Sequence, residues 1–329
     1  MIRACRHIFS GGCAFLTLVA FSAPSGVRAQ SFPSNVIRVV VPTGPGGPPD
    51  VISRVIATEL SENQGWRVVI ENRPGGAQTT GMADVLNHAA DGYSMYSMTV
   101  PSMAVPALFP NLGLRPDIDF APVVKISVSY NVLVVTPSLP VQSISELITV
   151  LKSHPGKFNF ASGGFGTPAH LIGEMFKLQT GVRATHIPYQ QAQQRMVDLL
   201  NGTTQFDFLA TVRAHEFIAT GKLRALAVTA PNRVAALKDV PTIVEEGFPG
   251  LVVEDYVGFA VKRGTPNQII ARLNEAINKA LEKQKVRDSF ANVGAVPVGG
   301  TQADFGNLIT SEVARWGTVV RESGIKMPN

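Results

Sequence analysis

The sequence predicts an α/β protein built from two lobes, which are joined by a hinge and enclose a ligand cleft. Segments typical of strands alternate with segments typical of helices after residue 29, as in parallel sheets with helical crossovers. A strand, a glycine-rich loop and a helix also follow one another twice, over residues 36–60 and 158–179. Because ligands collect outside the carboxyl ends of strands in open α/β sheets, two such loops indicate a binding protein that closes around a hinge.

The composition is that of a folded globular protein. Hydrophobic residues make up 45% of the 329 residues and charged residues 16%, which excludes an intrinsically disordered chain. The length is sufficient for two domains of ordinary size.

The first 29 residues have the pattern of a secretory signal peptide. Two arginines give a positive start, residues 8–23 form an apolar stretch, and Val-Arg-Ala at 27–29 is a small-residue cleavage site. A retained membrane anchor is the alternative, but the apolar stretch is short and is interrupted by glycines and Pro24. We therefore expect cleavage after Ala29.

Removing residues 1–29 changes what the charge and the cysteines imply. The segment contains three arginines and no acidic residue, so 26 basic and 24 acidic residues remain and the formal charge falls from +5 to +2. This small charge gives no reason to expect a nucleic acid or membrane-surface partner. Cys5 and Cys13 both lie in the segment, so the mature protein has no disulfide, thiol nucleophile or cysteine metal site. We expect neither a metal nor a cofactor.

The first part of the chain has the pattern of a β-α-β-α-β unit. A β-branched run at 36–41 predicts a buried strand, which the Pro/Gly loop 42–49 follows. Asp50 is a good N-cap for a helix at 51–60, because its carboxylate can accept from the free amides of the first turn. A strand at 67–71, a glycine turn at 72–77, a helix at 78–89 and a strand at 93–100 complete the unit.

The rest of the chain continues the alternation. A second glycine loop, 162–170, lies between a strand at 158–161 and a helix at 171–179, which repeats the arrangement of the first loop. Such helix N-termini attract anions, because free N–H groups point outward and the helix dipole favours negative charge. The other predicted strands are 123–126, 131–136, 185–188, 206–210, 223–229 and 252–261, and the other predicted helices are 145–152, 191–201, 269–281 and 303–323.

Motifs spread over nearly the whole mature chain support this organisation. The loop 42–50, Pro-Thr-Gly-Pro-Gly-Gly-Pro-Pro-Asp, precedes Val-Ile-Glu-Asn-Arg-Pro-Gly-Gly at 69–76 and Asp-Gly-Tyr at 91–93. Together with the later motifs they resemble the periplasmic solute-binding proteins of tripartite tricarboxylate transporters, the Bug or TctC-like family. The later motifs are the loop 162–166 with His-Leu at 170–171, Pro-Tyr at 188–189, Gly-Lys-Leu-Arg-Ala-Leu-Ala at 221–227, Val-Pro-Thr at 240–242 and Gly-Thr-Pro at 264–266.

The resemblance implies a type II-like periplasmic binding fold that captures a small organic acid and delivers it to a membrane permease. In this family carboxylates are held by backbone amides and ordered water from the two loops. We therefore expect a monomeric periplasmic receptor and no enzyme. The predicted strands place residues 30–125 and 258–329 in lobe 1 and 126–257 in lobe 2, with hinge segments near 122–126 and 255–258.

Four departures from the family pattern concern the ligand. Thr43 replaces the usual Phe, and the pair Pro48-Pro49 stiffens the first loop and removes amide donors. Residues 190–194, Gln-Gln-Ala-Gln-Gln, replace a glycine-containing turn, and Tyr256 stands where a Trp is common. These positions are expected to line or adjoin the cleft, so no relative's ligand can be transferred to this chain.

The predicted ligand-binding residues come from the loops and from strand ends, and most have a structural alternative. The glycines of the first loop serve either a ligand or a tight turn. Asp50 serves as a contact or an N-cap, His170 points at the cleft or packs against its loop, and Tyr189 caps a ligand or belongs to the core. The predicted set is Thr43, Gly46, Gly47, Asp50, Thr99, Ser162, Gly163, Gly166, Thr167, His170, Tyr189 and Asp207.

For two further residues the sequence also allows either a binding role or a structural role. Asp207 follows a strand, so it either binds a ligand amine or caps the next element. Arg213 is a possible carboxylate partner through its planar fork, or a solvated loop residue.

Three other functions compete with a transport receptor. A secreted hydrolase lacks a Gly-x-Ser-x-Gly elbow and a His-Glu-x-x-His motif, and Ser162 with His170 has no recognisable third member. A dinucleotide enzyme would need Gly-x-Gly-x-x-Gly, which the first loop does not have. A ligand-loaded sensor for a signalling receptor would have the same fold, so one sequence does not separate it from a transport receptor.

Overall fold

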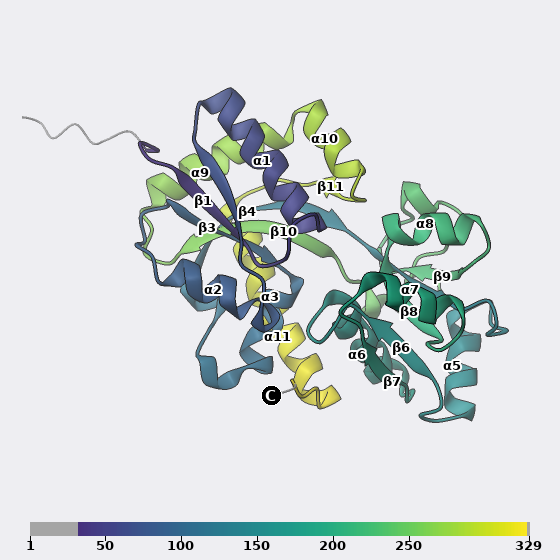
Figure 1. Ribbon diagram of the computed structural model, residues 1–329. Coiled ribbons are helices and arrows are strands. Elements are labelled where there is room, and N and C mark those ends of the chain that lie inside the picture. The colour runs from purple at the N-terminus through teal and green to yellow at the C-terminus, as the bar shows by residue number, and fades with distance from the viewer. Residues whose placement is uncertain (1–31, 328–329) are drawn as a thin grey trace, which may run out of the picture. The chain divides into compact units, whose positions relative to one another are not determined.

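The structure is a computed structural model, and it describes residues 32–327. The predicted signal peptide and both cysteines lie outside these residues. Within them the strands form a six-stranded sheet, in the order β11-β4-β10-β3-β1-β2, and a five-stranded sheet, in the order β7-β6-β8-β5-β9 (Figure 1). In residues 32–327, no helix has the length and the apolar character needed to cross a membrane.

The six-stranded sheet begins with the predicted β-α-β-α-β unit. Strand β1 lies between β2 and β3 and is parallel to both, as the alternation predicts. Strand β10 is antiparallel to both β3 and β4, and the short β11 pairs with the outer edge of β4. The strands are β1 (Ile37–Val41), β2 (Val68–Asn72), β3 (Ser94–Thr99), β4 (Phe120–Ser129), β10 (Asp255–Lys262) and β11 (Val296–Pro297).

Helices cover both faces of this sheet (Figure 1). One face packs Val39 and Val41 against α1, α9 and α10, and the other packs Val40 and Tyr96 against α2, α3 and α11. Alternate residues of β1 therefore serve opposite cores, as the period of a strand requires. The helices are α1 (Pro48–Gln64), α2 (Thr79–Leu86), α3 (Val100–Leu108), α9 (Asn267–Leu281), α10 (Gln284–Ala291) and α11 (Gln302–Ser323), with the short α4 (Pro116–Asp119), η1 (Gly76–Gln78) and η2 (Pro110–Leu112).

The five-stranded sheet contains the second glycine loop. Strand β6 is parallel to β7 and β8, whereas β5 is antiparallel to β8 and β9. Its strands are β5 (Asn131–Val135), β6 (Asn159–Ser162), β7 (Thr185–Pro188), β8 (Phe206–Ala210) and β9 (Arg224–Val228). Its helices are α5 (Ile144–Ser153), α6 (Pro168–Thr180), α7 (Ala192–Leu200) and α8 (Thr211–Ala219), with η3 (Ala235–Leu237) and η4 (Pro249–Leu251).

Several helix ends differ from the sequence prediction. Helix α1 begins at Pro48 with Gly47 as its N-cap, so Asp50 lies inside the first turn and is not the cap. A proline suits this position because its missing N–H would have no partner in the first turn. Helix α5, predicted at 145–152, begins at Ile144 with Ser143 as its N-cap, and the predicted helix 78–89 ends at Leu86. Helices α3, α8 and α10 were not predicted, and α3 contains Pro101 and Pro106, which sequence patterns treat as breaks.

The chain crosses between the sheets at two adjacent places. It leaves the first sheet between β4 and β5, at Tyr130, and returns through residues 252–254 into β10. The predicted lobe boundaries and hinge segments fall inside β4 and β10, because both strands continue in the first sheet up to these crossings.

Thr229 joins the two crossings. Its N–H donates to Asn131 O (2.8 Å), and its Oγ1 accepts from Asn131 N (3.1 Å) and donates to Val253 O (3.1 Å). The side chain is completely buried, so these bonds have no competition from water.

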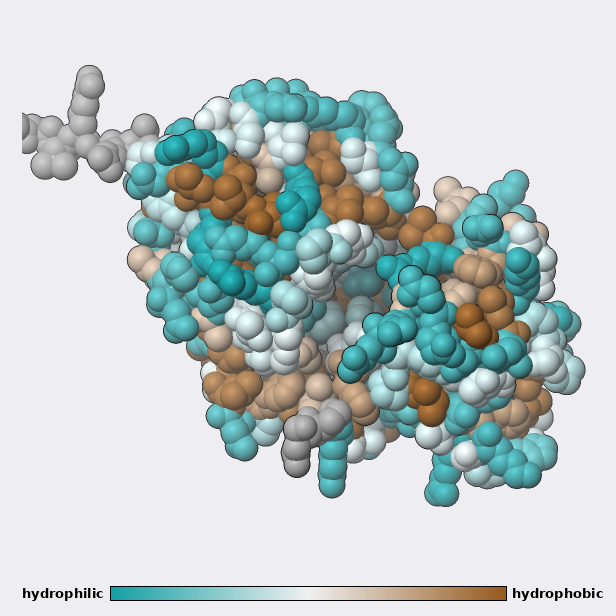
Figure 2. Space-filling model, in the orientation of Figure 1, coloured by the Kyte–Doolittle hydropathy of each residue, from teal (hydrophilic) through white to brown (hydrophobic). Residues whose placement is uncertain are grey.

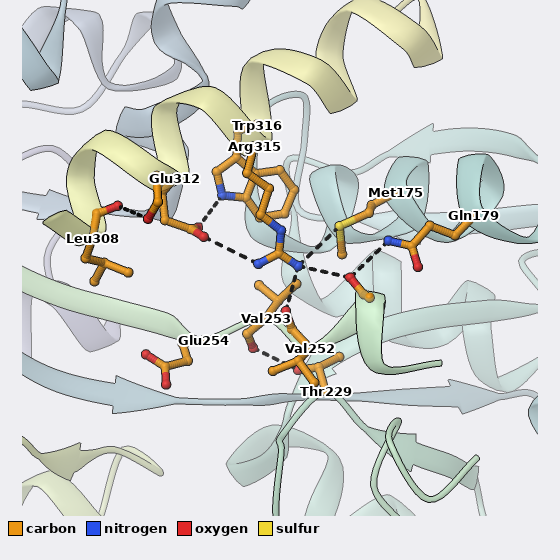
Figure 3. A network of polar contacts seen from close by, with 12 residues as sticks. Met175, Gln179, Thr229, Val252, Val253, Glu254, Leu308, Glu312, Arg315 and Trp316 are labelled. Atoms are coloured by element: carbon orange, nitrogen blue, oxygen red, sulfur yellow. Dashed lines mark hydrogen bonds and ion pairs between the residues drawn. The ribbon is translucent and has the colours of Figure 1, made fainter. Parts of the chain in front are cut away.

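Helix α11 also fastens the returning segment (Figure 3). Arg315 Nη2 donates to Val252 O (2.6 Å) and to Gly250 O (3.2 Å), and lies 3.5 Å from Met175 Sδ of α6. Trp316 Nε1 donates to Glu312 Oε2 (2.7 Å) in the same network. Because one hydrophobic cluster contains Trp316 of α11 together with Phe160 and Phe176 of the second sheet's layer, the two sheets share a core at this side.

Candidate functional site

A cavity of about 320 Å³ is lined by residues of both sheets and of the crossings between them. The first sheet and its loops contribute Thr43, Gln78 and Thr99, the second contributes Gly163, Thr167, Arg195 and Arg213, and the crossings contribute Ser129, Asn131 and Asp255. The space-filling view shows the surface hollowed between the elements of the two sheets (Figure 2). A larger cavity of about 510 Å³ lies at α9, α10 and β11, but only one sheet borders it. We take the smaller cavity as the candidate site because polar groups from both sheets converge there.

Two buried polar atoms of the cavity wall have no hydrogen-bond partner within residues 32–327. They are Thr43 Oγ1 and Asn131 Nδ2, and Asn131 is only 4% exposed. A buried polar group without a partner costs about 1–3 kcal/mol. Both atoms are therefore well placed to bond a polar group of a ligand.

Gln78 is a site residue that sequence reasoning missed. Its backbone has φ +84° and that of Ala77 has φ +47°, a left-handed conformation that non-glycine residues seldom adopt. Gln78 Nε2 donates to Thr99 Oγ1 (2.8 Å), and Ser102 Oγ donates to Gln78 Oε1 (2.6 Å). The strained turn thus fixes an amide beside the predicted residue Thr99 at the cavity wall. No sequence signal marks it, because the residue type does not indicate a positive φ.

Arg195 is a second site residue that was missed. It lies on α7 and forms a two-pronged ion pair with Asp207, whose carboxylate accepts from Nε at 2.7 Å. Asp207 is completely buried and does not line the cavity. Burial raises the pKa of the Asp207 carboxyl, and the Arg195 guanidinium opposes this shift. Asp207 therefore neither caps an element nor faces a ligand, but orients and neutralises the arginine that does line the cavity.

Arg213 and Asp255 bring one charge of each sign to the cavity. Arg213 lies in the first turn of α8, not in a loop, and within residues 32–327 no acidic side chain forms an ion pair with it. Asp255 begins β10 and is half-buried, and burial raises the pKa of its carboxyl to about 7. Sequence reasoning selected its neighbour Tyr256, whose side chain points to the opposite face of the same strand.

Two stacked histidines form hydrogen bonds that hold the second glycine loop in place. Ser162 Oγ bonds both Gly164 N (3.0 Å) and His186 Nε2 (2.6 Å), and Gly166 N donates to His170 Nδ1 (3.0 Å). The rings of His170 and His186 stack with centroids 4.0 Å apart. Ser162, Gly166 and His170 therefore support the loop and do not line the cavity, whereas Gly163 and Thr167 do.

The same surroundings keep both imidazoles neutral. Burial, aided by the charge of Lys177, lowers the pKa of His170 to about 4. Burial, followed by the charges of His170, Lys177 and Arg195, lowers the pKa of His186 to about 3.

The first glycine loop is closed on itself by Asp50. The Asp50 carboxylate accepts from Gly46 N (2.9 Å), from Asn72 Nδ2 (2.8 Å) and from Arg54 Nε (3.0 Å). Gly46, Gly47 and Asp50 lie off the cavity, which Thr43, Pro48 and Pro49 border instead. Because the two prolines have no N–H, this helix N-terminus presents few amides to an anion.

Two tyrosines that were expected at the cleft lie elsewhere. Tyr189 donates from its hydroxyl to Asp198 Oδ2 (2.7 Å) and does not line the cavity. Tyr256 is 1% exposed and packs edge-on against Phe305, so it belongs to the core and not to the cleft.

Comparisons with known proteins agree on one family. Residues 52–325 match the model of the tripartite tricarboxylate transporter family receptor. Protein BugT of Bordetella pertussis is 36% identical over 95% of this chain and 96% of its own. The R. palustris protein Rpa4515, solved with adipate, is 33% identical with a TM-score of 0.77 over 90% of this chain and 99% of its own. MatC from Rhodopseudomonas palustris, solved with bound malate, is 31% identical with a TM-score of 0.76 over 88% of this chain and 100% of its own.

Proposed function

Because the chain belongs to the tripartite tricarboxylate transporter receptor family, we propose that it is a periplasmic receptor that binds a small carboxylate and delivers it to a membrane permease. One observation carries the ligand class: the cavity that both sheets border holds an arginine, Arg213, that forms no ion pair within residues 32–327, beside further polar groups. A planar guanidinium binds a carboxylate with two parallel hydrogen bonds. Adipate and malate, the ligands in two related structures, are both small carboxylates.

The binding site combines predicted residues with residues that the fold brings to them. We propose that Arg213, with Gly163 and Thr167 of the second loop, binds the carboxylate. Thr43 Oγ1 and Asn131 Nδ2, which have no hydrogen-bond partner within residues 32–327, would then form hydrogen bonds with the ligand. The other residues of this site are Gln78, Thr99, Arg195 and Asp255.

The two sheets belong to two lobes that close over the ligand. The chain connects the lobes at the crossings near Tyr130 and Glu254, and the lobes also share the hydrophobic core beside α11. We further propose that residues 1–29 direct the chain to the periplasm and are removed, that the receptor is a monomer, and that it catalyses no reaction.

A thermal-shift screen of the protein purified from the periplasm tests the proposal. Mono- and dicarboxylates, amino acids and aromatic acids form the panel. A ligand at a hundred times its dissociation constant should add about 2.7 kcal/mol to the free energy of unfolding and raise the melting temperature by several degrees. A panel without a single stabilising acid would overturn the carboxylate assignment, and the family membership would remain.

A further inference from the structure

We propose that Asp255 selects a ligand that carries an ammonium group as well as a carboxylate, so that the receptor prefers amino acids to simple carboxylic acids. This inference rests on the proposed function and adds a substrate class to it.

The first observation is the position of the Asp255 carboxyl. Asp255 pairs with Ser129 across β10 and β4, and both residues line the cavity where the chain crosses between the sheets. Ser129 Oγ donates to the main-chain oxygen of Asp255 (3.1 Å) and not to its carboxyl. Within residues 32–327, no group donates a hydrogen bond to the carboxyl, and no basic side chain forms an ion pair with it. A carboxyl group at a cavity wall that lacks a hydrogen-bond donor and an ion-pair partner can be satisfied by a hydrogen-bond donor of the ligand.

The second observation is that the nearby basic residues are already paired. Lys125, on the strand beside β10, forms an ion pair with Glu254. Arg195 is neutralised by Asp207 through two hydrogen bonds. Only Arg213 remains as a cation of the cavity wall, and its side chain is exposed and belongs to the other sheet's layer. The cavity therefore presents one carboxyl group and one cation that do not pair with each other, and a ligand ammonium beside the carboxyl would favour its ionised form.

This charge pattern fits a zwitterion better than a dianion. A ligand with one carboxylate and one ammonium matches Arg213 and Asp255, and it leaves the cavity without net charge. A second carboxylate placed against Asp255 would meet a like charge, which disfavours ionisation of both groups. The cavity wall also includes the apolar residues Ile52, Phe208 and Val257, which suit a short aliphatic body.

Isothermal calorimetry with matched ligand pairs tests the inference on the protein purified from the periplasm. L-Norvaline is compared with valerate, L-2-aminobutyrate with butyrate, and 4-aminobutyrate with butyrate, because each pair differs only in the ammonium group. We expect at least one amino acid to bind about tenfold or more tightly than its partner acid. We expect Asp255→Asn to abolish that preference by weakening the amino acid, with the affinity for the partner acid kept or increased.

Asp239→Asn is the matched control, because Asp239 is exposed, does not line the cavity and forms no ion pair within residues 32–327. This variant should keep the wild-type preference, and melting curves of both variants establish that they are folded. Failure of every amino acid of the panel to bind more tightly than its partner acid, or an unchanged affinity of the preferred amino acid in Asp255→Asn, would overturn the inference and leave the carboxylate receptor intact. Absence of binding by every acid of the panel would overturn the proposed function itself.

Discussion

At the scale of single residues, Tyr256 is a buried polar group that the protein would lose at little cost. Its hydroxyl has no hydrogen-bond partner within residues 32–327, and its ring packs against Phe305. Replacing Tyr256 by Phe removes the unsatisfied oxygen and keeps the ring, so the free energy of unfolding should stay equal or rise by about 1 kcal/mol. Urea denaturation measures this change. A loss of more than about 1 kcal/mol would show that the hydroxyl has a partner in solution.

Two glycines with ordinary backbone angles make a matched pair for testing the site. A Cβ at Gly163 would stand 3.4 Å from the Arg195 guanidinium, inside the cavity, whereas a Cβ at Gly47 would meet nothing closer than 3.8 Å and lies off the cavity. Gly163→Ala should therefore weaken ligand binding about tenfold or more, while Gly47→Ala should leave the dissociation constant within about twofold. Equal effects of the two substitutions in calorimetry would contradict the proposed position of the site.

At the scale of elements, α11 holds the strand that returns from the second sheet. Arg315→Lys keeps the positive charge but removes Nη2, the guanidinium nitrogen that donates to both Val252 O and Gly250 O. The free energy of unfolding should fall by about 1–3 kcal/mol, because these carbonyls lose a charged donor. Arg321→Lys, on the same helix, is the control, since within the described residues the Arg321 side chain bonds only Thr318. A chemical denaturation series in which both variants unfold alike would show that Arg315 does not fasten this segment.

Thr229 is the second element-level contact, because it ties both crossings together. Thr229→Val has nearly the same shape but leaves Asn131 N–H and Val253 C=O without the hydroxyl. We expect a loss of about 1–3 kcal/mol in the free energy of unfolding, measured by urea denaturation. The control is Thr318→Val, at an exposed threonine of α11 whose hydroxyl, in the part of the chain that the structure describes, bonds only Ala314 O and Arg321. It should change the free energy of unfolding by less than about 0.5 kcal/mol.

At the scale of the whole molecule, the neutral histidine pair makes stability depend on pH. His170 and His186 have pKa values of about 4 and about 3 in the folded protein, below the value of 6.5 for an unperturbed histidine. The unfolded chain therefore binds more protons below pH 6.5, and stability is lost as the pH falls from about 6.5 towards 4. His170, which is 2% exposed, should account for about 2–3 kcal/mol of this loss.

Denaturation curves at several pH values measure this dependence. His170→Gln should flatten the curve between pH 6.5 and 4, while the exposed His215→Gln, on α8, should leave its slope unchanged. The same slope in wild-type protein and in His170→Gln would contradict the assignment.

The sequence predicts the layers of this molecule better than the wall of its cavity. Runs such as 36–41 are strands because β-branched residues fill two cores at once, and each predicted strand is present. Asp255 and Arg195 were missed for another reason. Which face of β10 or α7 meets the cavity depends on packing against α11 and on the Asp207 pair, and neither contact is local in sequence. Gln78 was missed because its left-handed backbone is imposed by its surroundings.

The pairing of Asp255 with Ser129 has a consequence for the order of events in binding. The chain passes between the sheets at this point, so we expect it to be the pivot of the proposed lobe closure. Residues at a pivot move little, whereas Gly163 and Arg213 would move with the second lobe. A ligand is then expected to bind Asp255 and Asn131 first, and Gly163 and Arg213 afterwards. Stopped-flow traces should show a phase whose rate rises with ligand concentration, followed by a phase whose rate does not.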